Sequence, residues 1–169
     1  MKLTELFLSE LESQADATRK VLERVPEGKP EWVPHPKSMR LGYLATLVAT
    51  MPGWIDFMIN KDELDLHPVG GEPYKQEEFS TRKELLAALD ASVAKGKAAL
   101  ESTTDEHLMK NWKFLVGGRT VSDQPRYVNL RDAVFNHMAH HRGQLTVYLR
   151  LNEAPVPAIY GPSADEKFN

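Results

Sequence analysis

A cluster of three histidines stands out near the end of the chain: His137, His140 and His141, half of the six in the sequence. On a helix, residues four apart lie one above the other, so His137 and His141 can direct two imidazoles to one spot, whereas His140 is turned well away. Two imidazoles in this arrangement commonly begin a divalent-metal site, but zinc normally takes three or four protein ligands. The pair is therefore a candidate metal site that needs further ligands.

The surrounding pattern predicts that this pair faces the protein interior. It lies on the apolar side of a helix expected over about 129–152, together with Leu130, Val134, Leu145 and Tyr148. A single buried histidine is usually explained by a hydrogen bond to a neighbour, and that reading stays open here. Two stacked buried imidazoles, however, favour a shared cation. A di-iron carboxylate site and a metalloprotease site are disfavoured, because neither Glu-x-x-His nor His-Glu-x-x-His occurs.

Composition and charge favour one soluble domain over residues 1–169. The net charge is −3 and acids and bases are mixed along the chain, which disfavours nucleic acid or an anionic membrane as a partner. The sequence has no cysteine, so disulfides, thiolate ligands and cysteine nucleophiles are excluded. The first residues do not resemble a signal peptide, and no apolar run approaches the roughly 18 residues of a membrane span. We expect a cytoplasmic protein.

Four long amphipathic patterns predict an all-α protein. They cover residues 3–25, about 38–58, about 81–100 and about 129–152, and the second carries Pro52-Gly53, where we expect a kink. Ser38 and Thr81 are the expected N-caps of the second and third helices. The polar residues 61–79 suit a long crossover connection, and 154–162 an extended tail. Residues 104–108 predict a short helical turn, and Gly117-Gly118 between two short apolar runs gives a weak hairpin signal.

Other residues are candidates for a cleft or for the surface. Trp54, Trp112, Tyr43 and Tyr148 can line a cleft, although packing in the core or an interface is favoured for at least two of them. The remaining histidines, His35, His67 and His107, are expected in exposed segments.

The sequence around the histidines resembles a known family. The run His137-x-x-x-His141-Arg142-Gly143-Gln144-Leu145, followed by Tyr148-Leu149-Arg150 and Val156-Pro157-x-x-Tyr160-Gly161, is similar to the C-terminal signature of the DinB/YfiT-like metalloenzyme superfamily. The segments 38–45 and 51–54 resemble the second helix of that family. The resemblance extends over nearly the whole chain.

This resemblance implies an up-down-down-up four-helix bundle, often a homodimer, with zinc or nickel held by three histidines. His137 and His141 match two of them. The third histidine of the family lies on the second helix, and its position falls here on Leu47, which cannot bind a metal. With two imidazoles, water or a carboxylate must complete the coordination.

Two functions follow from the resemblance and both stay open. The first is a metal-dependent transferase acting with a low-molecular-weight thiol, or a hydrolase, in which Arg142, Gln144 and Tyr148 are the candidates to orient the substrate or the ligands. The second is a degenerate, non-catalytic member that serves as a ligand-binding or dimerisation module. Whether the chain is an enzyme depends on whether a metal binds although Leu47 stands at the position of the third histidine.

Overall fold

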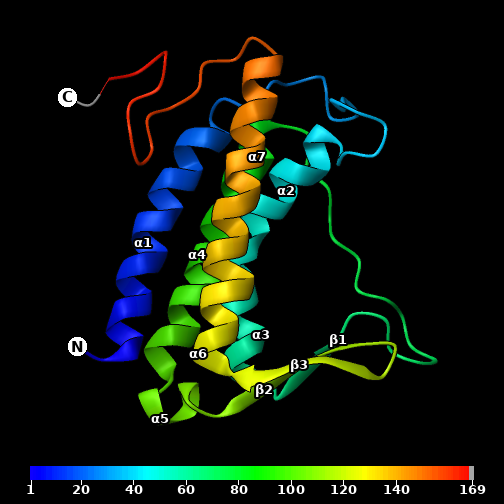
Figure 1. The fold of residues 1–169 in the computed structure, drawn as a ribbon, viewed down its shortest axis with the longest axis vertical. Coiled ribbons are helices and arrows are strands. Elements are labelled where there is room, and N and C mark those ends of the chain that lie inside the picture. Colours follow the sequence, from blue (N-terminus) through cyan, green and yellow to red (C-terminus); the bar gives the residue numbers. More distant parts are fainter. Residues whose placement is uncertain (168–169) are drawn as a thin grey trace.

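The computed structural model describes residues 1–167. Its main helices stand side by side in Figure 1, with a small sheet beneath one end. The helical elements are α1 (Leu3–Leu22), α2 (Leu41–Thr50), the 3₁₀ turn η1 (Met51–Gly53), α3 (Trp54–Asn60), α4 (Arg82–Ser102), α5 (Asp105–Leu108), α6 (Arg126–Asn129), the π-helical η2 (Leu130–Asn136) and α7 (His137–Leu151). Helix α4 packs on α1, α2 and α3, and α7 packs on α1 and α2.

The prediction of an all-α, up-down-down-up four-helix bundle is wrong, because the fold includes a three-stranded mixed sheet. Strands β2 (Asn111–Val116) and β3 (Arg119–Pro125) form an antiparallel hairpin, and β1 (Glu63–Asp65) pairs with β2 in parallel. Gly117 and Gly118 make the turn with positive φ of 62° and 75°, which suits glycine. The weak hairpin signal at this turn was therefore the correct part of the prediction.

Strand β1 lies inside the segment that was expected to be a plain connection. Its last residue, Asp65, fixes the hairpin turn: Oδ1 accepts a hydrogen bond from the backbone nitrogen of Gly117 at 2.9 Å, and Oδ2 accepts one from Gly118 at 2.6 Å. Beyond β1, the chain runs beside the helices to the start of α4 (Figure 1). The pairing was hidden from the sequence because a three-residue strand has too short a pattern to detect.

Helix boundaries follow local chemistry. Thr81 is the N-cap of α4, as predicted, with its Oγ1 accepting from the nitrogen of Glu84 at 3.2 Å. Pro52 lies in η1, so the expected kink takes the form of one 3₁₀ turn between α2 and α3. The expected Ser38 cap is wrong, since α2 begins at Leu41 after Arg40. Among residues 1–167, no helix combines the length and apolar character that crossing a bilayer requires.

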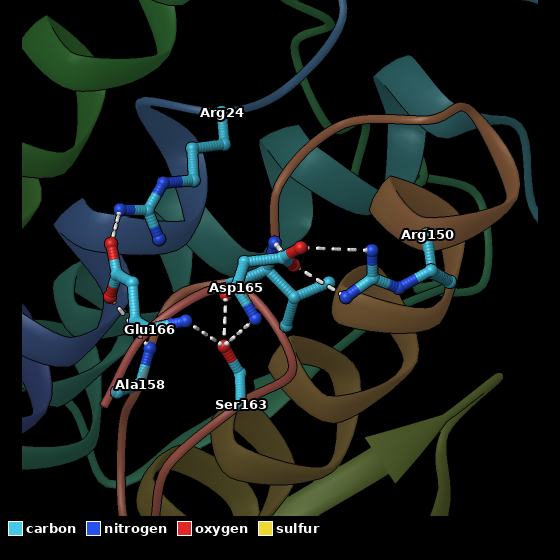
Figure 2. Close-up of polar contacts among 7 residues, drawn as sticks. Arg24, Arg150, Ala158, Ser163, Asp165 and Glu166 are labelled. Carbon is cyan, nitrogen blue, oxygen red and sulfur yellow. Dashed lines mark hydrogen bonds and ion pairs between the residues drawn. The ribbon is translucent and has the colours of Figure 1, made fainter. Parts of the chain in front are cut away.

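The C-terminal tail is held over α1 and α7 by polar contacts (Figure 2). Glu166 pairs with Arg24, which lies just beyond the end of α1, and Asp165 pairs with Arg150 of α7. Ser163 closes the turn between them, because its Oγ accepts from the nitrogens of Asp165 and Glu166 at 3.1 and 2.9 Å. The tail is thus tied to α7 and to the segment that follows α1.

Candidate functional site

His137 and His141 face each other on α7. Their Nε2 atoms lie 2.8 Å apart and their ring centroids 4.5 Å apart. His141 is 5% exposed, and His137 is partly buried at the first position of the helix. Spacing alone predicted this convergence, and the preceding η2 segment, with its i→i+5 hydrogen bonds, sets the angle at which His137 enters α7.

The other ring nitrogens of the pair are also engaged. Nδ1 of His141 lies 2.7 Å from Oε1 of Gln144, and the ring of His137 bonds to the backbone of Ala133. Two facing Nε2 lone pairs would repel, so one hydrogen or one cation must lie between them. In the neutral pair, one ring must therefore be the Nε2–H tautomer.

Burial lowers the pKa of both histidines below the ordinary value. For His137 the positive charge of a protonated His141 acts in the same direction, and the bond to Ala133 opposes it. For His141 the bond to Gln144 opposes the effect of burial. Both imidazoles are consequently neutral at pH 7, which is the form that shares a hydrogen or donates lone pairs.

The other candidate residues on α7 differ in whether their side chains reach the histidine pair. Gln144 contacts His141 directly, as described above. Arg142 is 1% exposed and turns toward α1, where it donates to the backbone oxygen of Gln14 at 3.2 Å and to Thr18 Oγ1 at 3.1 Å. Tyr148 donates to the backbone oxygen of Met39 at 3.1 Å. Only Gln144 of these three is in polar contact with the histidine pair.

Leu47 lies on α2 and is 6% exposed in an apolar cluster that includes Phe7, Met51 and Met138. Within residues 1–167, no group of three or more His, Cys, Asp and Glu side chains is placed to hold a metal ion. His140 is exposed, although its ring centroid is 5.0 Å from that of His141. Two imidazoles beside apolar surface do not by themselves complete the coordination of a zinc or nickel ion, which needs further ligands.

A cavity of about 460 Å³ opens beside His137, which forms part of its wall. It lies between α3, the sheet and the α6–η2 segment. Five aromatic side chains line it: Trp54, Phe57, Tyr74, Trp112 and Phe114. The polar lining residues are Ser122, Gln124, Asn129, Asp132 and His137. A mostly apolar concave wall with a few polar groups is typical of a site for a small molecule.

Four of the aromatic rings form a continuous row from the bundle to the sheet. The ring centroids are 6.4 Å apart for Trp54 and Phe57, 6.3 Å for Phe57 and Trp112, and 6.3 Å for Trp112 and Phe114. The indole of Trp54 also lies 5.9 Å from the imidazole of His137. The row thus connects the hairpin to the histidine pair.

Sequence reasoning named Trp54 and Trp112 as cleft candidates and His137 as a site residue, but it missed the other cavity residues. Trp112 and Phe114 are two apart on β2, so they share a face of the sheet, and this alternation was a usable signal. Tyr43 and Tyr148 do not line the cavity. Of the other histidines, His35 and His67 are exposed as expected, whereas His107 is partly buried and bonds to the backbone oxygen of Ile59 at 2.8 Å.

Comparisons with known proteins agree with the motif. The chain is 28% identical over 162 residues to the protein YrdA of Bacillus subtilis (strain 168), covering 95% of this chain and 89% of the relative. The crystal structure of a DinB-like protein from Bacillus cereus ATCC 10987 matches with a TM-score of 0.72 and 25% identity, covering 92% of this chain and 97% of that one. A DinB-like protein of Bacillus subtilis, YjoA, shares the fold with a TM-score of 0.64 and 22% identity, covering 90% of this chain and 95% of that one. The profile of the DinB family matches residues 1–167, and the chain therefore belongs to the DinB family.

Proposed function

We propose that this protein binds a small, largely apolar organic molecule in the cavity beside His137. The observation that carries the proposal is the cavity itself: about 460 Å³, walled by five aromatic side chains and by His137, one member of the neutral histidine pair. Covering this wall with an apolar ligand removes hydrocarbon surface from water, at about 25 cal/mol per Å² of buried area. The proposal corresponds to the ligand-binding alternative drawn from the sequence.

The histidine pair gives the bound molecule a polar neighbour. The two Nε2 atoms share one hydrogen, and the ring of His137 belongs to both the pair and the cavity wall. A proton can pass between the two imidazoles without a rearrangement of the helix, because both lie on one face of α7. The pair can thus accept or supply a proton at the inner side of the cavity.

The test uses two neighbouring residues of β3. Ser122 lines the cavity, whereas Val121 is 61% exposed and does not line it. Isothermal titration calorimetry would measure the binding of 1-naphthylmethanol, a neutral aromatic alcohol, to the natural protein, to Ser122→Phe and to Val121→Phe. A phenyl ring at position 122 should occupy the ligand's space, so we expect about tenfold weaker binding or none, with Val121→Phe unchanged. Equal binding by all three proteins would contradict the proposal.

A second candidate is the metal-dependent thiol transferase or hydrolase. One observation favours it, the convergence of two Nε2 atoms on one face of α7. Because the side chains do not complete a site, the ion would need water or the substrate as further ligands. The test is elemental analysis of protein purified without a histidine tag, together with His137→Ala and Leu47→His. Near-stoichiometric zinc or nickel in the natural protein, lost in His137→Ala, would support this candidate. Metal that appears only in Leu47→His would refute it.

A further inference from the structure

Resting on the proposed binding function, we infer that the cavity selects a small organic cation: a flat apolar body that carries an amine. The inference concerns the charge class of the ligand, which follows from the side chains that line the cavity. The aromatic wall, the acceptor oxygen of Asn129 and the distribution of charged groups favour a cation over an anion of the same shape.

The aromatic wall attracts positive charge. The faces of Trp, Tyr and Phe rings carry negative potential, and a cation held within about 6 Å of a ring centroid is stabilised by it. The cavity presents the row Trp54–Phe57–Trp112–Phe114, with Tyr74 at the exposed side. An ammonium group can therefore lie against a ring while the apolar body covers the others.

One polar side chain of the wall, Asn129, presents an acceptor in a fixed orientation. Asn129 is 7% exposed, and its Nδ2 donates to the backbone oxygens of Gln124 at 3.0 Å and Pro125 at 3.3 Å. These two bonds fix the orientation of the amide and use its donor hydrogens. Oδ1 is then the atom of this side chain that a ligand can use, and it accepts a hydrogen bond from an N–H group.

The charged groups around the cavity also favour a cationic ligand. Among residues 1–167, Asp132 is the charged residue in the lining, which includes no lysine or arginine. Arg131 donates to both carboxylate oxygens of Asp132, at 2.8 and 3.2 Å, so part of the negative charge is already balanced. A buried carboxylate or phosphate would still face the aromatic rings and Asp132 without a cationic side chain of the lining to pair with, which disfavours an anion.

Three naphthalene probes of similar shape and different charge test the inference: 1-naphthylmethylamine, 1-naphthylmethanol and 1-naphthoate. Their binding to the natural protein would be measured by calorimetry at pH 7, where the amine is protonated. We expect the amine to bind about fivefold more tightly than the alcohol and the carboxylate to bind most weakly. In Asp132→Asn the preference for the amine over the alcohol should fall, whereas the control Asp123→Asn should keep it. Asp123 lies on the same hairpin, bonds to Asn111 and does not line the cavity.

The outcomes separate this inference from the proposed function. Equal binding of the amine and the alcohol, or tighter binding of the carboxylate, would overturn the charge preference while leaving a binding cavity. An Asp132→Asn variant with the natural preference would also count against it. If none of the three probes binds the natural protein, the proposed function fails and the inference fails with it.

Discussion

The side-chain oxygen of Gln144 lies 2.7 Å from Nδ1 of His141, while Nε2 of the same ring faces His137. Both ring nitrogens of His141 are therefore engaged, one by Gln144 and the other by His137. An amide can accept from Nδ1–H or, turned over, donate to a bare Nδ1, so it is compatible with either tautomer. A side chain that can only accept a hydrogen bond would hold His141 in the form with hydrogen on Nδ1.

Gln144→Glu is expected to raise the pKa of His141. A carboxylate accepts from Nδ1–H and stabilises the protonated ring through its charge, against the burial that lowers the pKa in the natural protein. Histidine NMR titration would show the change. Gln144→Leu, which removes the bond that opposes burial, should move the pKa of His141 in the opposite direction. A shift of the same sign in both variants would contradict the assigned contact.

The stability of the protein should fall as the pH is lowered from about 7.5 to 5. His137 and His141 have folded-state pKa values below the ordinary value of about 6.5. Protonation therefore favours the unfolded chain, and the stability contributed by the neutral pair is present above the unfolded pKa and is lost as the pH falls through the folded values. Urea denaturation at the two pH values would measure this loss.

A double variant, His137→Asn/His141→Asn, is the control for this titration. It should lose less stability than the natural protein over the same interval, because it lacks the pair. Carboxylates with lowered pKa values titrate below this range and contribute little to the difference. Identical losses in the two proteins would show that the pair is not responsible.

Arg142→Lys is expected to cost about 2 kcal/mol of unfolding free energy. The guanidinium of Arg142 donates to Thr18 and to both the backbone and side-chain oxygens of Gln14, and lysine cannot reproduce this fork of donors in a buried site. Arg150→Lys, on the exposed side of the same helix, should change the stability by about 0.5 kcal/mol or less. Chemical denaturation would compare them, and similar losses would argue against a special role for Arg142.

Two glycine-to-alanine changes should have opposite effects. A Cβ at Gly96 of α4 would meet the backbone oxygen of Pro52 at 2.6 Å, so Gly96→Ala should destabilise the protein by about 2 kcal/mol through overpacking. Nothing lies within 4 Å of a Cβ at Gly143 in α7, so Gly143→Ala should stabilise it by about 0.5–1 kcal/mol. Thermal and urea unfolding of both variants would check the signs. A stable Gly96→Ala protein would show that η1 can move away from α4.

Some expectations remain predictions. The homodimer, the cytoplasmic location, the thiol substrate and the zinc or nickel ion all came from the family resemblance or from composition. The chain's membership in the DinB family supports looking for them, and the metal analysis proposed above is the direct test of the ion.

The sequence by itself determined the features that depend on residues close together in the chain. The i, i+4 spacing placed His137 and His141 on one face of α7, the Thr81-x-x-Glu84 pattern located the start of α4, and Gly117-Gly118 marked the hairpin turn. Each is decided by the period of a helix or by the conformation that a turn requires. The family signature likewise lies within one short segment.

Only the tertiary structure decided which distant residues these features contact. Strand β1 pairs with β2 across fifty positions of sequence, with Glu63 opposite Lys113, and this pairing brings Leu64 and Phe114 together in the cavity wall. The row of aromatic rings joins α3 to the hairpin, and the partners of Arg142 lie on α1. Such contacts depend on which apolar surfaces, distant in the sequence, pack against each other and away from water. The periodicity of one element shows that it has a buried face but does not specify the element that covers it.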